Sequence, residues 1–138
     1  DVTEDGFTRK GLGIAYDVKK VRSMAGTDAD HWFKLSKDEK KEKFDSLGVN
    51  APEVVPTQAM RQEAFDNWET TDDHGMVIYG LAKDNKGREY FMVKNSWGDY
   101  GKYHGMFYAS KAYVAYKTMN ILINKKTIPA AIAKKLGL

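Results

Sequence analysis

Two short apolar runs separated by a turn-forming segment constrain the fold of this chain most. Residues 76–81 and 90–93 are rich in β-branched and aromatic residues. Between them, residues 83–87 read KDNKG, a composition typical of a turn. This pattern predicts two antiparallel strands joined by a hairpin. Because a hairpin brings the start of its first strand beside the end of its second, we expect His74 and Asn95 to be neighbours in space.

A histidine held by an asparagine side-chain oxygen makes up two parts of a Cys-His-Asn site. In such a site the asparagine fixes the imidazole tautomer and the histidine takes the thiol proton. The residues around His74 and Asn95 make the match to such a site more specific, because DHG precedes the first apolar run and KNSWG ends the second. Together with MRQEAFDNWETTDDHGM over residues 60–76, they resemble the papain-like cysteine peptidases, most closely the bleomycin hydrolase and aminopeptidase C branch. The resemblance is densest over residues 57–110.

The resemblance implies a role for five residues. His74 and Asn95 match the catalytic histidine and asparagine, and Trp97 matches the tryptophan that packs over their hydrogen bond. An indole in that place keeps water from competing for the bond. Asp73 matches a position whose backbone carbonyl binds the substrate amide, and Gly75 matches a small position beside the second specificity pocket.

The chain contains no cysteine, so nothing in it matches the papain-like nucleophile. We therefore expect this chain to be the C-terminal part of a longer polypeptide, inactive alone, whose upstream half carries the cysteine. The resemblance implies an aminopeptidase that acts on peptides, assembles as a homo-oligomer, often a hexameric ring, and works in the cytoplasm. It implies no cofactor. Endopeptidase or mixed activity stays open at this point.

Composition excludes several other classes of function. The chain of 138 residues is expected to be a single domain, with 42% apolar and 30% charged residues. A net charge of +3 is too small and scattered to predict nucleic-acid binding. No run approaches the roughly 18 apolar residues that a membrane span needs. Without cysteine there are no thiolate metal sites, and His104, in a glycine-rich loop, lacks partners at ligand spacing, so no metal site is predicted.

Two helices are predicted before the hairpin. Ser36 and Glu39 form a capping box that opens a helix to Leu47, with Gly48 as its stop. Residues 26–56, which contain this surface helix, are expected to be an insertion relative to the shortest papain-like enzymes. Thr57 is predicted to cap a second helix through Trp68, whose apolar stripe packs into the core; the stripe consists of Met60, Ala64, Phe65 and Trp68.

After the hairpin, the pattern predicts a strand over 106–109, a short helix over 111–116 capped by Ser110, and a strand over 119–123. Pro129 opens a last helix to Leu136 that should dock its apolar side onto the sheet. Turns rather than long crossovers link these strands, which favours an antiparallel sheet. We therefore predict an α+β fold with an antiparallel, barrel-like sheet and flanking helices, the sheet-bearing half of a papain-like fold.

Two other interpretations of the sequence remain. A non-catalytic papain-like homologue would keep His74 and Asn95 for structure and act as a binding or scaffold protein. Alternatively, the chain is a complete and independent interaction domain, which should bury its tryptophan and methionine side chains and behave as a stable monomer. The half-fold interpretation instead predicts an exposed apolar face and a tendency to associate.

Overall fold

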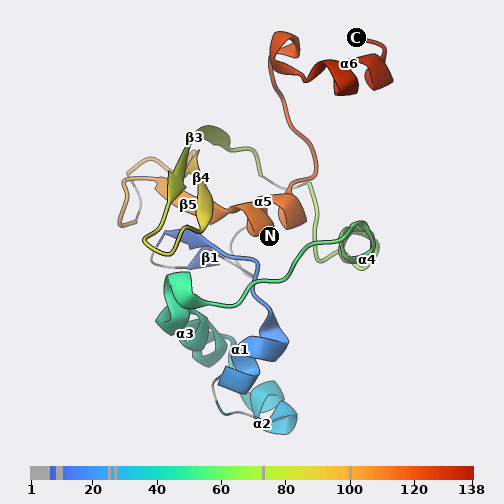
Figure 1. The fold of residues 1–138 in the computed structure, drawn as a ribbon. Coiled ribbons are helices and arrows are strands. Elements are labelled where there is room, and N and C mark those ends of the chain that lie inside the picture. Colours follow the sequence, from blue (N-terminus) through green and yellow to red (C-terminus); the bar gives the residue numbers. More distant parts are fainter. Residues whose placement is uncertain (1–6, 9–10, 25, 27, 73, 100) are drawn as a thin grey trace.

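The computed structural model describes residues 7–8, 11–24, 26, 28–72, 74–99 and 101–138. Helices and one five-stranded sheet make up an α+β fold, as predicted (Figure 1). The elements follow in the order β1 (Phe7–Thr8), β2 (Leu12–Gly13), α1 (Val18–Met24), α2 (Ala29–Lys34), α3 (Lys37–Leu47), α4 (Gln58–Asp66), β3 (Val77–Lys83), β4 (Glu89–Lys94), β5 (Met106–Ser110), α5 (Lys111–Lys117) and α6 (Ala130–Leu136), with 3-10 turns at Gly48–Asn50 and Lys125–Thr127.

The predicted hairpin is confirmed. Strands β3 and β4 pair antiparallel from Val77 opposite Lys94 to Lys83 opposite Glu89. The turn between them is held by Asp84, whose side chain accepts hydrogen bonds from the backbone N–H groups of Lys86 and Arg88. Carboxylates close turns in this way because they offer acceptors to unpaired backbone donors.

The prediction of an antiparallel, barrel-like sheet is only partly right. The strand order is β1-β2-β5-β4-β3, and β2 pairs parallel to β5. The parallel pair arises because the chain leaves β2, passes through four helices and the hairpin, and returns as β5, which is a crossover rather than a turn. The sheet is open, with β1 and β3 at its edges, and the short two-residue strands at one side cannot close it into a barrel.

Side chains alternate along the strands and build one cluster on each face of the sheet. The first cluster contains Val93, Phe107 and Ala109, with Tyr113 of α5 and Ala15 packed on them. The second is formed by Ile14, Ala51 and Tyr90, against which the end of α3 packs through Leu47. These clusters fix β4 and β5 from both sides and hence the end of β4 that carries Asn95.

The helix starts follow the sequence closely. Ser36 caps α3 in a complete capping box with Glu39, and Gly48 ends the helix with a positive φ of 50°. Thr57 and Ser110 each accept a hydrogen bond from the N–H group three residues on, at the starts of α4 and α5. These three caps were predicted because capping is a local interaction between neighbours in sequence.

The predicted packing of α4 is wrong at its C-terminal end. Of its apolar stripe, Ala64 is buried, whereas Phe65 is exposed and Trp68 is 82% exposed. The helix also ends at Asp66, earlier than predicted, and Trp68 adopts a left-handed φ of 65°. A residue in that conformation cannot continue a right-handed helix, so its side chain leaves the stripe.

The C-terminal segment also differs from the prediction. Residues 119–124 are extended but unpaired, and Leu122 is 100% exposed. Helix α6 lies away from the sheet with Ile132 and Leu136 exposed, so it does not dock there (Figure 1). An apolar extended run becomes a strand only where a second strand offers hydrogen-bond partners, and no described strand lies beside this one. We call residues 119–138 the C-terminal arm.

Candidate active site

The first and last residues of the hairpin lie side by side at its open end, opposite the turn. His74 lies just before β3 and Asn95 directly follows β4, in line with the pairing of Val77 with Lys94. The side chains touch, with His74 Nε2 2.7 Å from Asn95 Oδ1. The proximity that the hairpin predicted is therefore present.

The contacts of Asn95 show whether the oxygen or the nitrogen of its side-chain amide faces His74. The backbone N–H of Ser96 donates to Asn95 Oδ1 at 2.7 Å, and a backbone N–H always needs an acceptor. The oxygen, not the nitrogen, therefore faces His74. Because that oxygen only accepts, Nε2 of His74 carries the hydrogen and donates it. In the neutral ring, Nδ1 is then left as the acceptor, and no described residue hydrogen-bonds to it.

Asn95 itself is held rigidly. Its side chain is buried, and its backbone N–H donates to Gly105 O at 2.9 Å. Gly105 has a φ of 77°, and a Cβ there would lie 2.0 Å from Gly98 O. Gly98 and Gly105 therefore approach closely beside the residue that orients His74. Lys94 closes the same loop by donating from Nζ to His104 O.

Trp97 stacks loosely on the histidine. The two ring centroids lie 5.8 Å apart, with the planes tilted by 32°. The indole is 40% exposed, so one side contacts the imidazole while the other faces solvent. This arrangement covers part of the imidazole ring without burying it.

The two predicted substrate-binding residues differ in what can be said of them. Gly75 is exposed, and a Cβ added to it would meet nothing within 4 Å, so there is open space beside His74. Asp73 lies outside the described residues.

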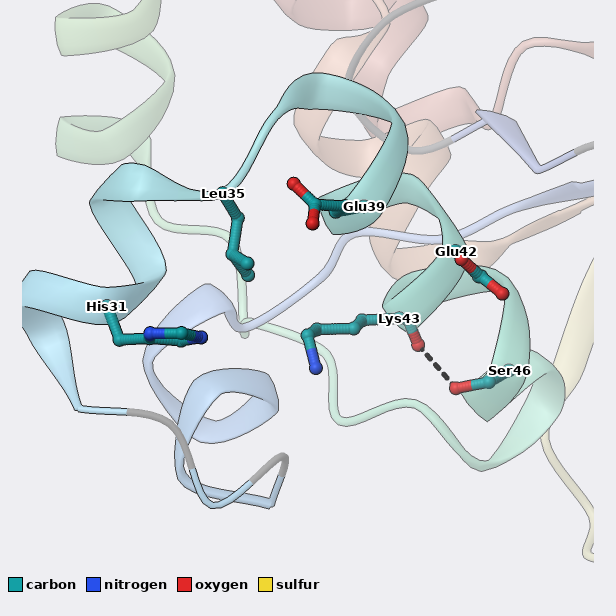
Figure 2. A pocket seen from close by; sticks show the side chains of 6 residues that line it. All are labelled: His31, Leu35, Glu39, Glu42, Lys43 and Ser46. Atoms are coloured by element: carbon teal, nitrogen blue, oxygen red, sulfur yellow. Dashed lines mark hydrogen bonds between the residues drawn. The ribbon is translucent and has the colours of Figure 1, made fainter.

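A second feature, an open hollow between α2 and α3, involves a different part of the chain. Figure 2 shows His31 and Lys43 pointing into the space between the two helices. Glu39 is engaged in the cap of α3, and Ser46 donates to the carbonyl of Lys43. The hollow is lined by His31, Leu35, Glu39, Glu42, Lys43 and Ser46. Because these groups are mostly exposed or already paired, the hollow is a surface irregularity between helices.

The described residues offer neither a metal site nor a membrane-spanning helix. No group of three histidine, cysteine or carboxylate side chains in this part of the chain could hold a metal ion. Nor is any helix among the described residues long and apolar enough to cross a membrane.

Several residues around the site were not found from the sequence. Gly105 and Ser96 hold Asn95 through backbone atoms, which leave no side-chain signature. Lys117 and Thr70 contact each other beside the segment that leads to His74, although 47 positions separate them. Ser96 lies in the KNSWG motif and Gly105 in the glycine-rich loop, so these two had a local sequence signal. Lys117 and Thr70 had none, because the fold sets long-range contacts.

In this α+β unit, a buried asparagine orients a histidine at the end of the hairpin. Such a pair is an arrangement that sites for nucleophilic catalysis use. The family model described as the Peptidase C1-like family matches residues 43–137. The match covers more than half of the chain, so the chain belongs to this family and is related to the papain-like peptidases. No curated protein matches the chain.

Proposed function

We propose that this chain is the C-terminal part of a cysteine peptidase of the bleomycin hydrolase and aminopeptidase C branch. In this proposal His74 and Asn95 are catalytic residues, and an upstream segment of the same polypeptide supplies the nucleophilic cysteine. The single observation that carries the proposal is the 2.7 Å contact between His74 Nε2 and Asn95 Oδ1. It leaves Nδ1 as the nitrogen that exchanges a proton with a thiol.

The proposed reaction is acyl transfer to the cysteine. The thiol gives its proton to Nδ1 of His74, and the thiolate attacks the carbonyl carbon of the substrate peptide bond. The imidazolium then protonates the leaving amine as the C–N bond breaks, which leaves a thioester. Water attacks the thioester while His74 takes a proton from it. The C–S bond then breaks to release the acid, and the imidazolium returns its proton to the departing thiolate. Asn95 keeps the ring in one tautomer throughout, and Trp97 shields its hydrogen bond.

Exposed apolar side chains support an upstream half that covers this chain. The edge strand β3 exposes Val77, Ile78 and Leu81, and the C-terminal arm exposes Ile121 and Leu122. Large apolar side chains exposed on an edge strand and on an arm without a partner strand offer area that a second unit could bury. In the proposed enzyme, the upstream half covers part of this surface and forms the second wall of the cleft beside Gly75. Asp73 contributes its carbonyl to the substrate amide in the same cleft.

Resemblance to the bleomycin hydrolase branch is the basis for the finer proposal. It rests on the residues from Met60 to Met76 that precede the first strand of the hairpin. On this basis the substrate is the N-terminal residue of a peptide, the assembly is a homo-oligomer, and the compartment is the cytoplasm. None of these steps requires a cofactor.

A second candidate is a non-catalytic homologue in which His74 and Asn95 only stabilise the open end of the hairpin. The observation that favours it is the absence of any cysteine from the 138 residues. Such a protein would bind peptides or scaffold partners without turning them over.

Mass spectrometry of the native gene product, treated with an epoxysuccinyl inhibitor of cysteine peptidases, separates the two candidates. We expect one adduct, on a cysteine upstream of Asp1, that is lost in the His74→Ala variant. His104→Ala is the matched control, because His104 lies in the neighbouring loop and its side chain pairs with Asp99. A product that forms no adduct would refute the peptidase and leave the binding protein. An adduct that persists in His74→Ala would show a reactive thiol that does not depend on this site.

A further inference from the structure

Lys117, the last residue of α5, joins that helix to the segment that leads into His74. Its Nζ donates to Glu69 O and to Thr70 Oγ1, both at 3.1 Å. Thr70 is buried, and its own N–H donates to Ala64 O in α4 at 2.8 Å. The chain is therefore fixed at Thr70, shortly before His74.

The helix end that carries Lys117 is itself anchored. The guanidinium of Arg61 in α4 donates to the carbonyls of Ala115, Tyr116 and Thr118, the last at 2.8 Å. Carbonyls at the C-terminus of a helix have no partner within the helix, so a fork of N–H donors stabilises them. Helix α4 thus fixes the C-terminal end of α5, which carries Lys117.

Backbone strain lies directly beside this contact. Trp68 adopts a left-handed φ of 65°, an unfavourable conformation for a residue with a Cβ. Its indole is 82% exposed, so burial of the side chain does not offset the cost. Such a conformation persists only where the surroundings fix it. Hydrogen bonds lie on both sides of it: Trp68 N–H donates to Phe65 O, and the bonds from Thr70 to Ala64 and from Lys117 to Glu69 and Thr70 follow.

His74 sits between this anchor and the hairpin. On its C-terminal side Met76 packs on the core cluster and Val77 pairs with Lys94. On its N-terminal side the anchor is Thr70. The imidazole is half-buried, and its one hydrogen bond to the described residues goes to Asn95. Thr70, four positions before His74, is thus an anchored residue on this side of the histidine.

We propose that Lys117 is a positioning residue for His74: by tying Glu69 and Thr70 to the end of α5, it holds the imidazole where Nε2 donates to Asn95 Oδ1. The importance of this role for catalysis rests on the proposed function of His74. The geometric role does not, because the hydrogen bond to Asn95 can be observed without turnover.

The test is ¹⁵N NMR of the native gene product labelled on histidine, at about pH 8.5, where an ordinary histidine is neutral. The signals of His74 are assigned by their loss in His74→Gln. In the wild type we expect ring nitrogen shifts of a single Nε2–H tautomer. Lys117→Met keeps the length of the side chain but removes its donors, and we expect it to give averaged shifts of mixed tautomers. Lys117→Arg should restore the wild-type pattern, since it can still donate to both oxygens.

Lys111→Met is the matched control, because Lys111 begins the same helix and its Nζ pairs with Glu89 of β4, away from this segment. It should leave the His74 shifts unchanged. Thr70→Val, which removes one acceptor of Lys117 with little change in volume, serves as a second variant should Lys117→Met not fold, and Thr70→Ser should restore the pattern.

Unchanged His74 shifts in folded Lys117→Met would overturn the proposal, and so would unchanged shifts in Thr70→Val where that variant replaces it. This holds even if the melting temperature falls, because a merely structural role lowers stability without altering the tautomer. Equal effects in Lys111→Met would overturn it as well. Failure of the proposed peptidase would be seen separately, as a wild-type protein that forms no inhibitor adduct while its His74 signals still respond to Lys117→Met.

Discussion

Asn95 Oδ1 accepts two hydrogen bonds at once, one from His74 Nε2 and one from the N–H of Ser96, each at 2.7 Å. This shared acceptor couples the tautomer of the histidine to the backbone of the loop after β4. Any change at Asn95 therefore affects the local fold as well as the histidine.

Asn95→Ala should lower the free energy of unfolding by about 1–3 kcal/mol, because it leaves the Ser96 N–H and His74 Nε2 without their shared acceptor at a partly buried position. Urea titration followed by tryptophan fluorescence measures the change. Asn85→Ala is the control, since Asn85 is an exposed turn residue, and surface substitutions usually stay within about 0.5 kcal/mol. Equal effects of the two substitutions would contradict a structural role for the shared acceptor.

Gly105→Ala should destabilise the protein more than Gly101→Ala. Both glycines have positive φ values, 77° and 72°, so alanine is strained at each by about 1–2 kcal/mol. Only at Gly105 would the new Cβ also collide with a backbone atom, Gly98 O at 2.0 Å. A backbone oxygen cannot rotate away, so the loop must open and Asn95 must lose its hydrogen bond to Gly105.

Urea midpoints and hydrogen exchange at the Asn95 amide test this difference. We expect faster exchange of that amide in Gly105→Ala and unchanged exchange in Gly101→Ala. Two variants with the same midpoint and the same exchange rate would mean that the loop tolerates the collision and does not hold Asn95.

The features that could be predicted from sequence are those fixed by residues close together in the sequence. The capping box of Ser36 and Glu39 depends on two residues three apart, and the hairpin turn depends on Asp84 and the residues after it. His74 and Asn95 were found for the same reason, because the hairpin alone brings them together. Their proximity therefore needs no information from distant parts of the chain.

Features that depend on a distant partner were missed or wrong. Residues 119–123 have the composition of a strand, but composition does not say whether a second strand lies beside them. The stripe of α4 was expected to be buried throughout, although Phe65 faces solvent because no described element packs over it. Lys117 looks like an ordinary surface lysine until the fold places Thr70 next to it.

Stability should fall at alkaline pH through buried tyrosines. Burial raises the pKa of Tyr90 to about 12, and burial also raises the pKa of Tyr16. As the pH passes about 10, the unfolded chain releases these protons while the folded chain keeps them. The unfolded state then binds fewer protons, so the free energy of unfolding decreases as pH rises, by about 1.4 kcal/mol per pH unit for one tyrosine. The contribution of each tyrosine is fully present below pH 10.

Urea titrations between about pH 8 and pH 12 measure this slope. Tyr90→Phe should make it shallower at high pH, because phenylalanine has no proton to lose. Tyr79→Phe is the control, since Tyr79 is exposed and its hydroxyl donates only to Met106 Sδ. An identical slope in wild type and Tyr90→Phe would show that Tyr90 titrates alike in both states.

The isolated 138-residue chain should associate with itself through its exposed apolar surface. Leu122 is fully exposed and Ile121 is mostly so, on an arm with no described strand beside it. Burial of apolar area stabilises by about 25 cal/mol per Å², so contact between such surfaces is favourable. Replacing both residues by lysine should shift sedimentation profiles toward the monomer. Val55→Lys is the control, because Val55 is equally exposed but lies far from the arm in sequence.

A wild-type chain that stays monomeric at every concentration would contradict the need for a covering half and favour the independent domain. Association that Val55→Lys abolishes as completely as the double arm variant would instead point to nonspecific stickiness. Association lost only in the arm variant would identify the arm as the surface that the upstream half covers in the proposed enzyme. The expected order, with the arm variant most monomeric, follows from the exposure of Ile121 and Leu122 on an arm with no described strand beside it.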